Sequence, residues 1–214
     1  MPYRTDEILR YAACREADET VMALCKECIR EAEPVLEYRV CSTVLPVDRQ
    51  GDFLQIGCLK TDSKTLKTAV SGCEKVLLFA ATLGVGFDRL IERYSRLSPA
   101  KALMFQALGA ERIESLCDTY VMRRETELSA CGLHLKPRVS AGYGDLPLAI
   151  QTQIFAMLDC PRKMGLTLNA SLVMSPSKSV TAFAGITPCG DDDEPLTKCL
   201  ACSQKGCQYR RTEP

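Results

Sequence analysis

The apolar residues in the first part of the chain change from helical to strand spacing at Pro34. Residues 5–15 and 17–33 are predicted to be helices, because their apolar side chains recur at helical spacing. Residues 35–46 and 53–59 are rich in β-branched and alternating apolar residues, which is typical of strands. The polar residues between these two ranges favour a turn, so the pattern predicts a β-hairpin.

The centre of the chain is predicted to contain a buried strand between helices. A short helix is expected near 62–70, and residues 75–82 form a continuous apolar run typical of a central strand. Ser98 and Pro99 provide a capping side chain and a proline at the first helical position. We therefore expect a long helix from there to about Ala130.

The last apolar segments favour a helix and an antiparallel pair of strands. Residues 148–158 are predicted to be helical. Residues 165–174 alternate apolar and polar side chains, which predicts a half-buried strand. After a turn at 175–178, residues 179–186 are expected to return as its partner strand.

One acidic residue interrupts the apolar stripe of the long helix. Glu114 continues a set of apolar residues at helical spacing, and a lone buried carboxylate is costly unless it is paired. Two interpretations stay open: Glu114 is buried beside a cation, for which Arg138 is available, or the helix rotates slightly and Glu114 is solvated at the edge of the stripe. The apolar members of the stripe are Leu103, Ala107, Ala110, Cys117 and Val121.

The densest group of candidate functional side chains lies in residues 136–148. This segment combines Arg138 and an aromatic ring with Gly142 and Gly144, which permit unusual backbone angles and let a ligand approach the main chain. Prolines stiffen both of its ends. The pattern fits a loop that holds a ligand and, equally, an ordinary rigid connection.

A Gly-x-Gly pair follows the apolar run of residues 75–82. Gly84 and Gly86 lie at a predicted strand-to-helix junction, as in nucleotide-binding folds. However, the third glycine position holds Arg89, and no acidic residue ends a following strand. A tight turn is therefore the favoured interpretation, and a Rossmann-type methyltransferase is the least favoured function.

Composition and charge narrow the class of protein. A chain of 214 residues with 46% hydrophobic and 25% charged residues suits one good-sized globular domain or two small ones. Lys+Arg and Asp+Glu are equal at 27 each, which argues against a nucleic-acid partner. No segment approaches the roughly eighteen successive apolar residues of a membrane span, and the start is polar. We therefore expect a cytoplasmic protein with no membrane association.

The thirteen cysteines are expected to be reduced, because a chain of this size does not need disulfides and their number is odd. A single histidine, His134, argues against a His-rich metal centre. Cys25 and Cys28 form a Cys-x-x-Cys pair inside a predicted helix, where burial in the core is preferred. Burial is also expected for the isolated cysteines Cys58, Cys73, Cys117, Cys131 and Cys160.

The amino-acid composition changes at residue 189. We assign residues 1–188 to one domain and residues 189–214 to a Cys-rich tail. An acidic linker precedes a Cys-x-x-Cys pair and a further cysteine. Closely spaced thiolates bind zinc or an iron–sulfur cluster, so the tail is predicted to hold a metal, with a free tail as the alternative. The predicted ligands are Cys189, Cys199, Cys202 and Cys207.

Four motifs occur together in this chain, within a resemblance that runs from about Ile8 to the tail. They are Arg138-Val-Ser-Ala-Gly142-Tyr143-Gly-Asp-Leu-Pro147, Gly165 to Met174 continuing as Met174-x-Pro176-x-Lys178-Ser179-Val180, the segment Phe79 to Ile91, and Cys199-x-x-Cys202 with Cys207 and Arg210. In this combination the chain resembles the activation domain of cobalamin-dependent methionine synthase, and most closely its free-standing members.

The resemblance implies an α+β fold with a twisted, mainly antiparallel sheet flanked by long helices. It also implies a site for S-adenosylmethionine, in which Arg138 contacts the ligand carboxylate and Glu114 lies opposite as the acidic partner of the sulfonium. The backbone at Ser140 meets polar groups of the ligand, and Tyr143 lines the pocket beside Gly142. The family's Trp-rich segment and Tyr-Tyr stretch have no counterpart here, and the chain contains no Trp.

The implied function is that of an accessory module. It docks on a corrinoid-binding methionine synthase that lacks its own activation domain, and it assists reductive remethylation of the cobalamin on that partner, with S-adenosylmethionine as methyl donor. An electron-donor protein is a further implied partner. Such a chain is a module of a methyltransferase rather than a complete enzyme. The alternative is an iron–sulfur or zinc-binding redox accessory protein of a corrinoid methyltransferase system.

Overall fold

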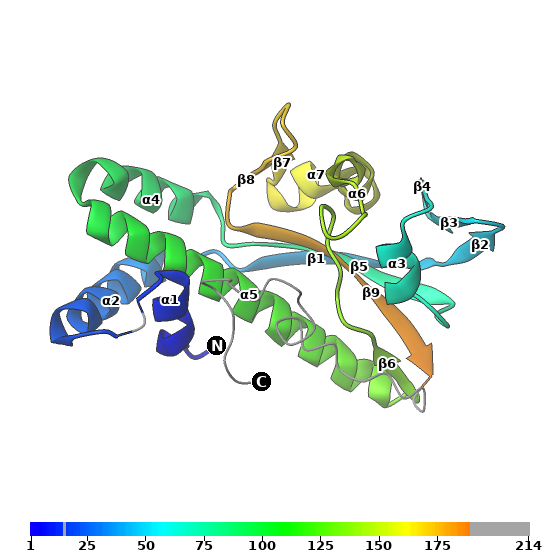
Figure 1. Ribbon diagram of the computed structural model, residues 1–214, viewed down its shortest axis with the longest axis horizontal. Helices are drawn as coiled ribbons and strands as arrows, with labels where there is room; N and C mark the ends of the chain where they lie inside the picture. Colours follow the sequence, from blue (N-terminus) through cyan, green and yellow to red (C-terminus); the bar gives the residue numbers. More distant parts are fainter. Residues whose placement is uncertain (15, 189–214) are drawn as a thin grey trace.

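A four-stranded antiparallel sheet forms the centre of the computed structural model, which describes residues 1–14 and 16–188 (Figure 1). The strand order is β1-β5-β9-β6, and each neighbouring pair is antiparallel. These strands are β1 (Arg39–Pro46), β5 (Lys75–Thr82), β9 (Ser179–Pro188) and β6 (Leu133–Leu135). Helices accompany this sheet, so the predicted α+β fold with a mainly antiparallel sheet is confirmed.

Strand β5 lies between β1 and β9 and is buried on both faces, because a hydrophobic cluster packs on each face. All of its residues except Lys75 are buried, as the continuous apolar run predicts. Its side chains alternate between two cores: Phe79 belongs to one apolar cluster and Leu78 to the other. The sheet therefore separates two hydrophobic cores.

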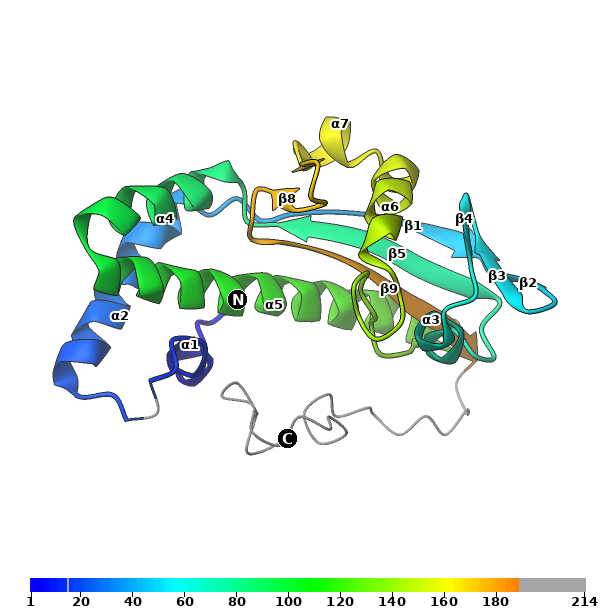
Figure 2. The ribbon, with the colours of Figure 1, turned by 45° about the horizontal axis from the view of Figure 1, so that its top comes forward.

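Helix α5, the longest, runs along one face of the sheet (Figure 2), and three further helices pack against α5. At its start, Ser98 Oγ accepts a hydrogen bond from the Lys101 amide at 3.4 Å and Pro99 occupies the first turn, as predicted. These helices are α1 (Thr5–Tyr11), α2 (Glu19–Ala32), α4 (Val85–Leu97) and α5 (Pro99–Ser129).

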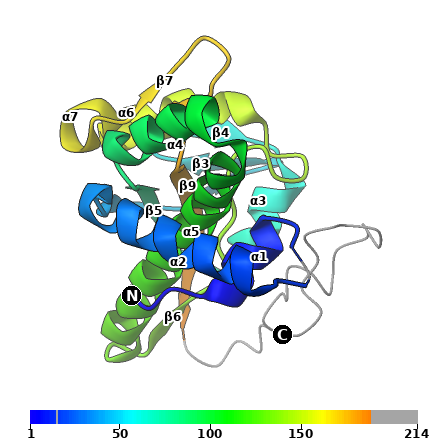
Figure 3. The same cartoon turned by 90° about the vertical axis from the view of Figure 1, so that its left-hand side faces the viewer.

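Shorter elements cover the other face, and Figure 3 shows α6 and α7 on the side of the molecule away from α1 and α2. Two small sheets, β2-β3-β4 and β7-β8, complete the described fold. The remaining elements are η1 (Glu33–Val35), β2 (Asp48–Gln50), β3 (Phe53–Ile56), β4 (Leu59–Thr61), α3 (Lys64–Ala69), η2 (Leu148–Ile150), α6 (Gln151–Leu158), α7 (Cys160–Met164), β7 (Thr167–Leu168) and β8 (Met174–Ser175).

The predicted hairpin between residues 35–46 and 53–59 is wrong. Strand β1 pairs along its whole length with β5, from Arg39 opposite Thr82 to Pro46 opposite Lys75. The hairpin that forms instead joins β3 to β2, a strand made from the residues expected to be the turn. Pairing with β5 extends along all eight residues of β1, whereas β3 has only four, so the long-range partner offers more backbone hydrogen bonds.

The predicted pairing of residues 165–174 with residues 179–186 is also wrong. Asn169 Oδ1 accepts hydrogen bonds from the amides of Ser171 at 2.9 Å and Val173 at 3.0 Å, which folds this segment back on itself. It therefore contains only the short pair β7 and β8. Strand β9 instead lies inside the main sheet, between β5 and β6.

The Gly-x-Gly pair forms a tight turn between β5 and α4, as favoured from the sequence. Gly84 has a φ of +82°, and a Cβ atom there would lie 2.7 Å from Glu37 Cβ. A Cβ atom at Gly86 would lie 2.9 Å from the carbonyl oxygen of Val35. These glycines therefore admit a neighbouring backbone segment. The antiparallel sheet around them is unlike the parallel sheet of a Rossmann fold.

Burial of the cysteines follows their place in the fold. Cys25 and Cys28 are buried in the core, as expected, and burial is also confirmed for Cys73, Cys117 and Cys160. The expectation is wrong for Cys58 and Cys131, which are exposed because they lie in turns after β3 and after α5.

No helix among the described residues combines the length and apolar character that a membrane span requires.

Candidate functional site

Helix α5 presents three carboxylates along one side. Glu111, Glu114 and Asp118 are separated by three and four positions, so their side chains lie above one another on the helix surface. Their exposure differs: Glu111 is fully buried, whereas the side chains of Glu114 and Asp118 are 34% and 45% exposed. The buried carboxylate needs compensation from cations of other elements.

The first cation is Arg138, which the chain places after β6. The backbone there continues beside β9, because the Lys136 amide donates to the Gly185 carbonyl at 2.8 Å and Val139 exchanges hydrogen bonds with Phe183 at 2.8 and 2.9 Å. Val139 enters the core on the far face of the sheet, and its neighbour Arg138 reaches α5 on the other face.

Arg138 joins two of the carboxylates. Its Nη2 donates to Glu114 Oε2 and to Asp118 Oδ1, both at 2.7 Å, and its side chain is 11% exposed. Burial by itself would lower the pKa of Arg138, but the charges of Glu114, Cys117 and Asp118 raise it above its ordinary value. The guanidinium is therefore a fixed positive charge at this place.

Two further arginines extend the ion pairs toward the N-terminus. Arg4 Nε donates to Glu111 Oε1 at 3.4 Å, and Arg4 Nη2 lies 3.8 Å from Asp118 Oδ2. Arg112 donates to both oxygens of Glu111, from Nε at 2.5 Å and from Nη2 at 2.6 Å, and Ser115 Oγ donates to Oε1 at 2.6 Å. Glu111 and Arg112 are both fully buried.

Arg112 also fixes the first residues of the chain. Its Nη1 donates to the carbonyl of Met1 at 3.2 Å and its Nη2 to that of Pro2 at 2.6 Å, while its guanidinium carbon lies 4.1 Å from the centroid of the Tyr3 ring. Burial opposes ionisation of Glu111, but hydrogen bonds from Arg112 and Ser115 outweigh it and hold the pKa of Glu111 below its ordinary value.

These side chains form one connected set, which we call the arginine–acid cluster. Its formal charges cancel, because it contains equal numbers of arginines and acids. Arg4 Nη2 is buried and makes no hydrogen bond to the described residues, so this part of the cluster still has an unused donor. The members of the cluster are Arg4, Glu111, Arg112, Glu114, Asp118 and Arg138.

Of the two interpretations of Glu114, the structure supports the one that places it at the edge of the buried stripe, and the fully buried acid is Glu111, three residues earlier. Leu103, expected in the stripe, is 54% exposed. The helix is therefore rotated toward Glu111 and Arg112, because these two side chains satisfy each other inside the core. The pairing of Glu114 with Arg138 is present nonetheless.

The second half of the loop 136–148 is held against α3. Asp145 accepts hydrogen bonds from Ser63 Oγ at 2.7 Å, Lys64 N at 2.8 Å and Thr65 N at 2.9 Å, which caps the first turn of α3. These bonds keep the pKa of Asp145 well below its ordinary value. The loop is thus rigid for a structural reason that its glycines and prolines alone did not reveal.

The other predicted ligand-binding residues lie farther along this loop. The Tyr143 amide donates to the Ser140 carbonyl at 3.2 Å, and the Gly142 amide donates to the Leu146 carbonyl at 2.8 Å. The Tyr143 side chain is 59% exposed and makes no hydrogen bond or ring contact within the described chain. The structure therefore joins Arg138 to Glu114, but no interaction joins Tyr143 to either.

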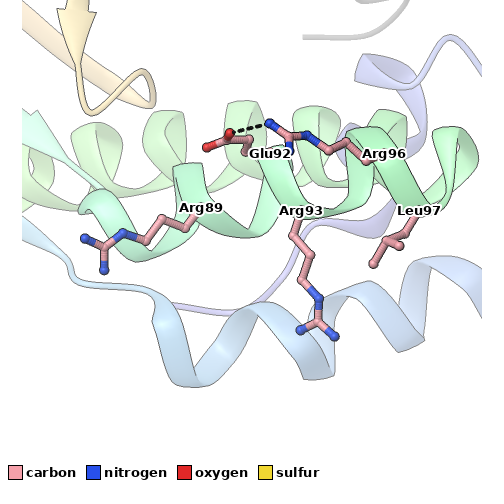
Figure 4. Close-up of a pocket in the computed structure, with 5 residues that line it drawn as sticks. All are labelled: Arg89, Glu92, Arg93, Arg96 and Leu97. Carbon is pink, nitrogen blue, oxygen red and sulfur yellow. Dashed lines mark hydrogen bonds and ion pairs between the residues drawn. The ribbon is translucent and has the colours of Figure 1, made fainter.

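A separate hollow lies on the outer surface of α4 (Figure 4). Arg96 Nη2 donates there to Glu92 Oε1 at 3.2 Å, one turn away on the helix. None of its residues belongs to the arginine–acid cluster. The hollow is lined by Arg89, Glu92, Arg93, Arg96 and Leu97.

The predicted metal ligands lie outside the described residues, so the cysteine tail stays a prediction. Residues 1–14 and 16–188 contain no group of three or more His, Cys, Asp or Glu side chains that could hold a metal ion. The predicted ligands concerned are Cys189, Cys199, Cys202 and Cys207.

Sequence comparison identifies no relative, since neither a protein-family model nor a curated protein matches this chain. Comparison of structures does find similar proteins. The fold matches the crystal structure of the MetH reactivation domain bound to AdoHcy, with a TM-score of 0.59 and 19% sequence identity. The match covers 83% of this chain and 69% of that chain. At this identity the comparison establishes a shared fold.

Proposed function

We propose that this chain is an accessory module of cobalamin-dependent methionine synthase. It assists reductive remethylation of a corrinoid carried by a partner synthase that lacks its own activation domain, and S-adenosylmethionine is the methyl donor. The fold of the MetH reactivation domain supports this role, as do the sequence motifs, which indicate the same family independently of the fold. The matched domain has AdoHcy, the demethylated form of this donor, bound to it.

The charges of the arginine–acid cluster suit the amino-acid end of such a ligand, which carries a carboxylate, an ammonium and a sulfonium. Both hydrogen bonds of Arg138 to the described chain use Nη2. Its Nη1 and Nε groups make no hydrogen bond to the described chain, so each can donate a single charge-assisted hydrogen bond to a carboxylate. Glu114 and Asp118 provide the negative charge that an ammonium or sulfonium requires. These unused donors of Arg138, beside two carboxylates, are the observation that carries the proposal.

The residues of this chain would bind and orient the donor rather than carry out bond chemistry. The methyl group belongs to S-adenosylmethionine and the metal centre to the partner, so the chain contributes a charged site held by the sheet and α5. Arg138 is positioned for this by the backbone pairing of its neighbours with β9. Ser140, Gly142 and Tyr143 are proposed to meet the rest of the ligand.

Calorimetry with S-adenosylmethionine and with AdoHcy tests the small-molecule part. Arg138→Lys keeps the charge but loses the separate guanidinium donors, and we expect it to weaken binding by about tenfold to a hundredfold, the worth of one charge-assisted interaction. Arg123→Ala is the control, because Arg123 is 80% exposed on α5, the helix that carries Glu114, and pairs with Glu127. Thermal melting must show that both variants fold.

Absence of binding heat for the native chain, both alone and with the corrinoid protein, would contradict the ligand assignment. The partner part has its own test, in which the chain is mixed with a synthase fragment that ends at its corrinoid domain. We expect co-elution on size exclusion, and conversion of cob(II)alamin absorbance to that of methylcobalamin when a reductant and S-adenosylmethionine are supplied. Separate elution would contradict the proposed partnership.

The alternative, a redox protein with a metal in its tail, rests on the sequence spacing of Cys199, Cys202 and Cys207. Anaerobic purification followed by visible absorption and metal analysis tests it directly. A colourless chain free of iron and zinc would exclude a metal role for the tail. It would leave the accessory role intact, because the arginine–acid cluster lies in the described domain.

A further inference from the structure

Strand β1 leaves one edge of the main sheet unpaired. It lies at the end of the strand order β1-β5-β9-β6, so only its inner side meets a neighbouring strand. The Val47 amide donates to the Glu74 carbonyl at 2.9 Å, which continues the register of β1 with β5 by one residue. In an antiparallel ladder alternate residues bond the neighbouring strand, so the odd-numbered residues of β1 bond β5. Val40, Ser42 and Val44 therefore direct their N–H and C=O groups outward.

These outward backbone groups have no hydrogen-bond partner within the described chain. Neither a backbone group nor a side chain of residues 1–14 and 16–188 bonds to the main chain of Val40, Ser42 or Val44. Pro46 occupies the next outward position of the strand. A proline is tolerated there because its missing N–H would have faced away from β5. The free edge therefore runs along β1 from Val40 to Pro46.

The middle of this edge lacks the features that usually prevent strands from pairing. No bulge interrupts the register of β1 with β5, and Arg39, the charged residue of the strand, stands at its first position. Ser42 and Val44 are exposed, Val44 to 41%. Their side chains lie on the α5 side of the sheet, because the Ser42 hydroxyl accepts a hydrogen bond from Tyr120 of that helix at 2.6 Å. A long, open edge of this kind is a template for another strand.

We propose that the strand which covers this edge is β1 of a second copy of the chain, in an antiparallel dimer with two-fold symmetry. With Thr43 at the axis, Ser42 lies opposite Val44 of the second copy, and Val40 lies opposite Pro46 of the second copy. Each outward N–H group then meets a carbonyl, and Pro46 only accepts, as its missing N–H requires. The two Thr43 side chains face each other, which is a favourable cross-strand pair. The edge is thus complementary to itself.

Pairing through β1 keeps the second copy away from the arginine–acid cluster. Strands β1 and β6 form opposite edges of the sheet, and Arg138 follows β6. The dimer joins two four-stranded sheets into one and places the two clusters toward its outer edges. Two-fold dimers are the commonest soluble homo-oligomers, so this symmetry is an ordinary one. The inference rests on the geometry of β1 and does not depend on the function proposed above.

Light scattering coupled to size exclusion, over a series of chain concentrations, tests for the dimer. We expect a mass twice that of one chain, which decreases on dilution. Val44→Lys places a charge in the middle of the free edge and should halve the measured mass. Val85→Lys is the matched control and should leave the mass doubled, because Val85 is 46% exposed and lies at the start of α4. Thermal melting must show that both variants fold.

Hydrogen exchange followed by NMR identifies the surface that pairs. The amides of Val40 and Ser42 should exchange at least about tenfold faster in Val44→Lys than in the native chain. The Val47 amide, which is bonded to Glu74, should stay slow in both. A monomeric native chain, or a dimer that survives Val44→Lys, would overturn the proposal. Protection of the Val40 and Ser42 amides only after addition of the corrinoid-binding synthase fragment would also overturn it, and would assign the edge to that partner.

Discussion

The buried ion pair of α5 allows a direct test of how this fold tolerates charge in its core. Glu111→Ala removes a carboxylate that accepts hydrogen bonds from Arg112, Ser115 and Arg4. The guanidinium of Arg112 then stays inside the core with two backbone carbonyls as its remaining acceptors. We expect a large loss of stability from this single change.

The magnitude follows from the burial of both partners. Removing one member of a buried ion pair costs about 3–5 kcal/mol, because the other charge is left uncompensated. Replacing both members by apolar residues avoids that penalty, so Glu111→Leu combined with Arg112→Leu should lie within about 1–2 kcal/mol of the native chain. The exposed pair of Arg123 and Glu127 is the control, and Arg123→Ala should change the stability by less than about 1 kcal/mol.

Urea unfolding at pH 7, followed by circular dichroism, measures these differences. The contribution of Glu111 to the free energy of unfolding should also depend on pH in one direction. Because the pKa of Glu111 is lowered in the folded state, its contribution is present above the unfolded value near 4.5 and is lost as the pH falls. That loss should be absent in Glu111→Ala. A single variant that loses less than about 1 kcal/mol, or a double variant as unstable as the single one, would refute the reasoning.

Two further substitutions test local features of the fold. Asp145→Asn should speed hydrogen exchange at the Lys64 and Thr65 amides, because a neutral amide is a weaker cap for α3. In the native chain the pKa of Asp145 is lowered, so the protection of these amides should be present above about pH 4 and fade as the pH falls further. Unchanged exchange would show that the cap is unimportant. Gly84→Ala should destabilise by about 1–3 kcal/mol in urea, because φ is +82° and the added Cβ meets Glu37; native stability would contradict the tight-turn interpretation.

Several local features were predictable from the sequence for a simple reason. The start of α5 depends on Ser98 and Pro99, and the burial of β5 depends on its unbroken apolar run, so both are encoded by neighbouring residues. The pairing of Glu114 with Arg138 was also anticipated, since a carboxylate near an apolar stripe needs a cation. Local propensity and charge thus identified parts of the site before its geometry was known.

Other members of the site could not be predicted in this way. Nothing near Glu111 in the sequence indicates that Arg4 and the carbonyls of Met1 and Pro2 reach its side of α5. Such contacts connect segments that the pattern of a single helix or strand does not relate.

By itself, the sequence determined where most helices form, which strand is the most buried, and which motifs point to the activation-domain family. Tertiary structure alone decided the partners of β1 and β9, the rotation of α5 that buries Glu111 instead of Glu114, and the capping of α3 by Asp145. The physical reason is that spacing and capping act over a few residues. Strand pairing and charge burial, in contrast, are settled by the total area and the hydrogen bonds gained when distant segments meet.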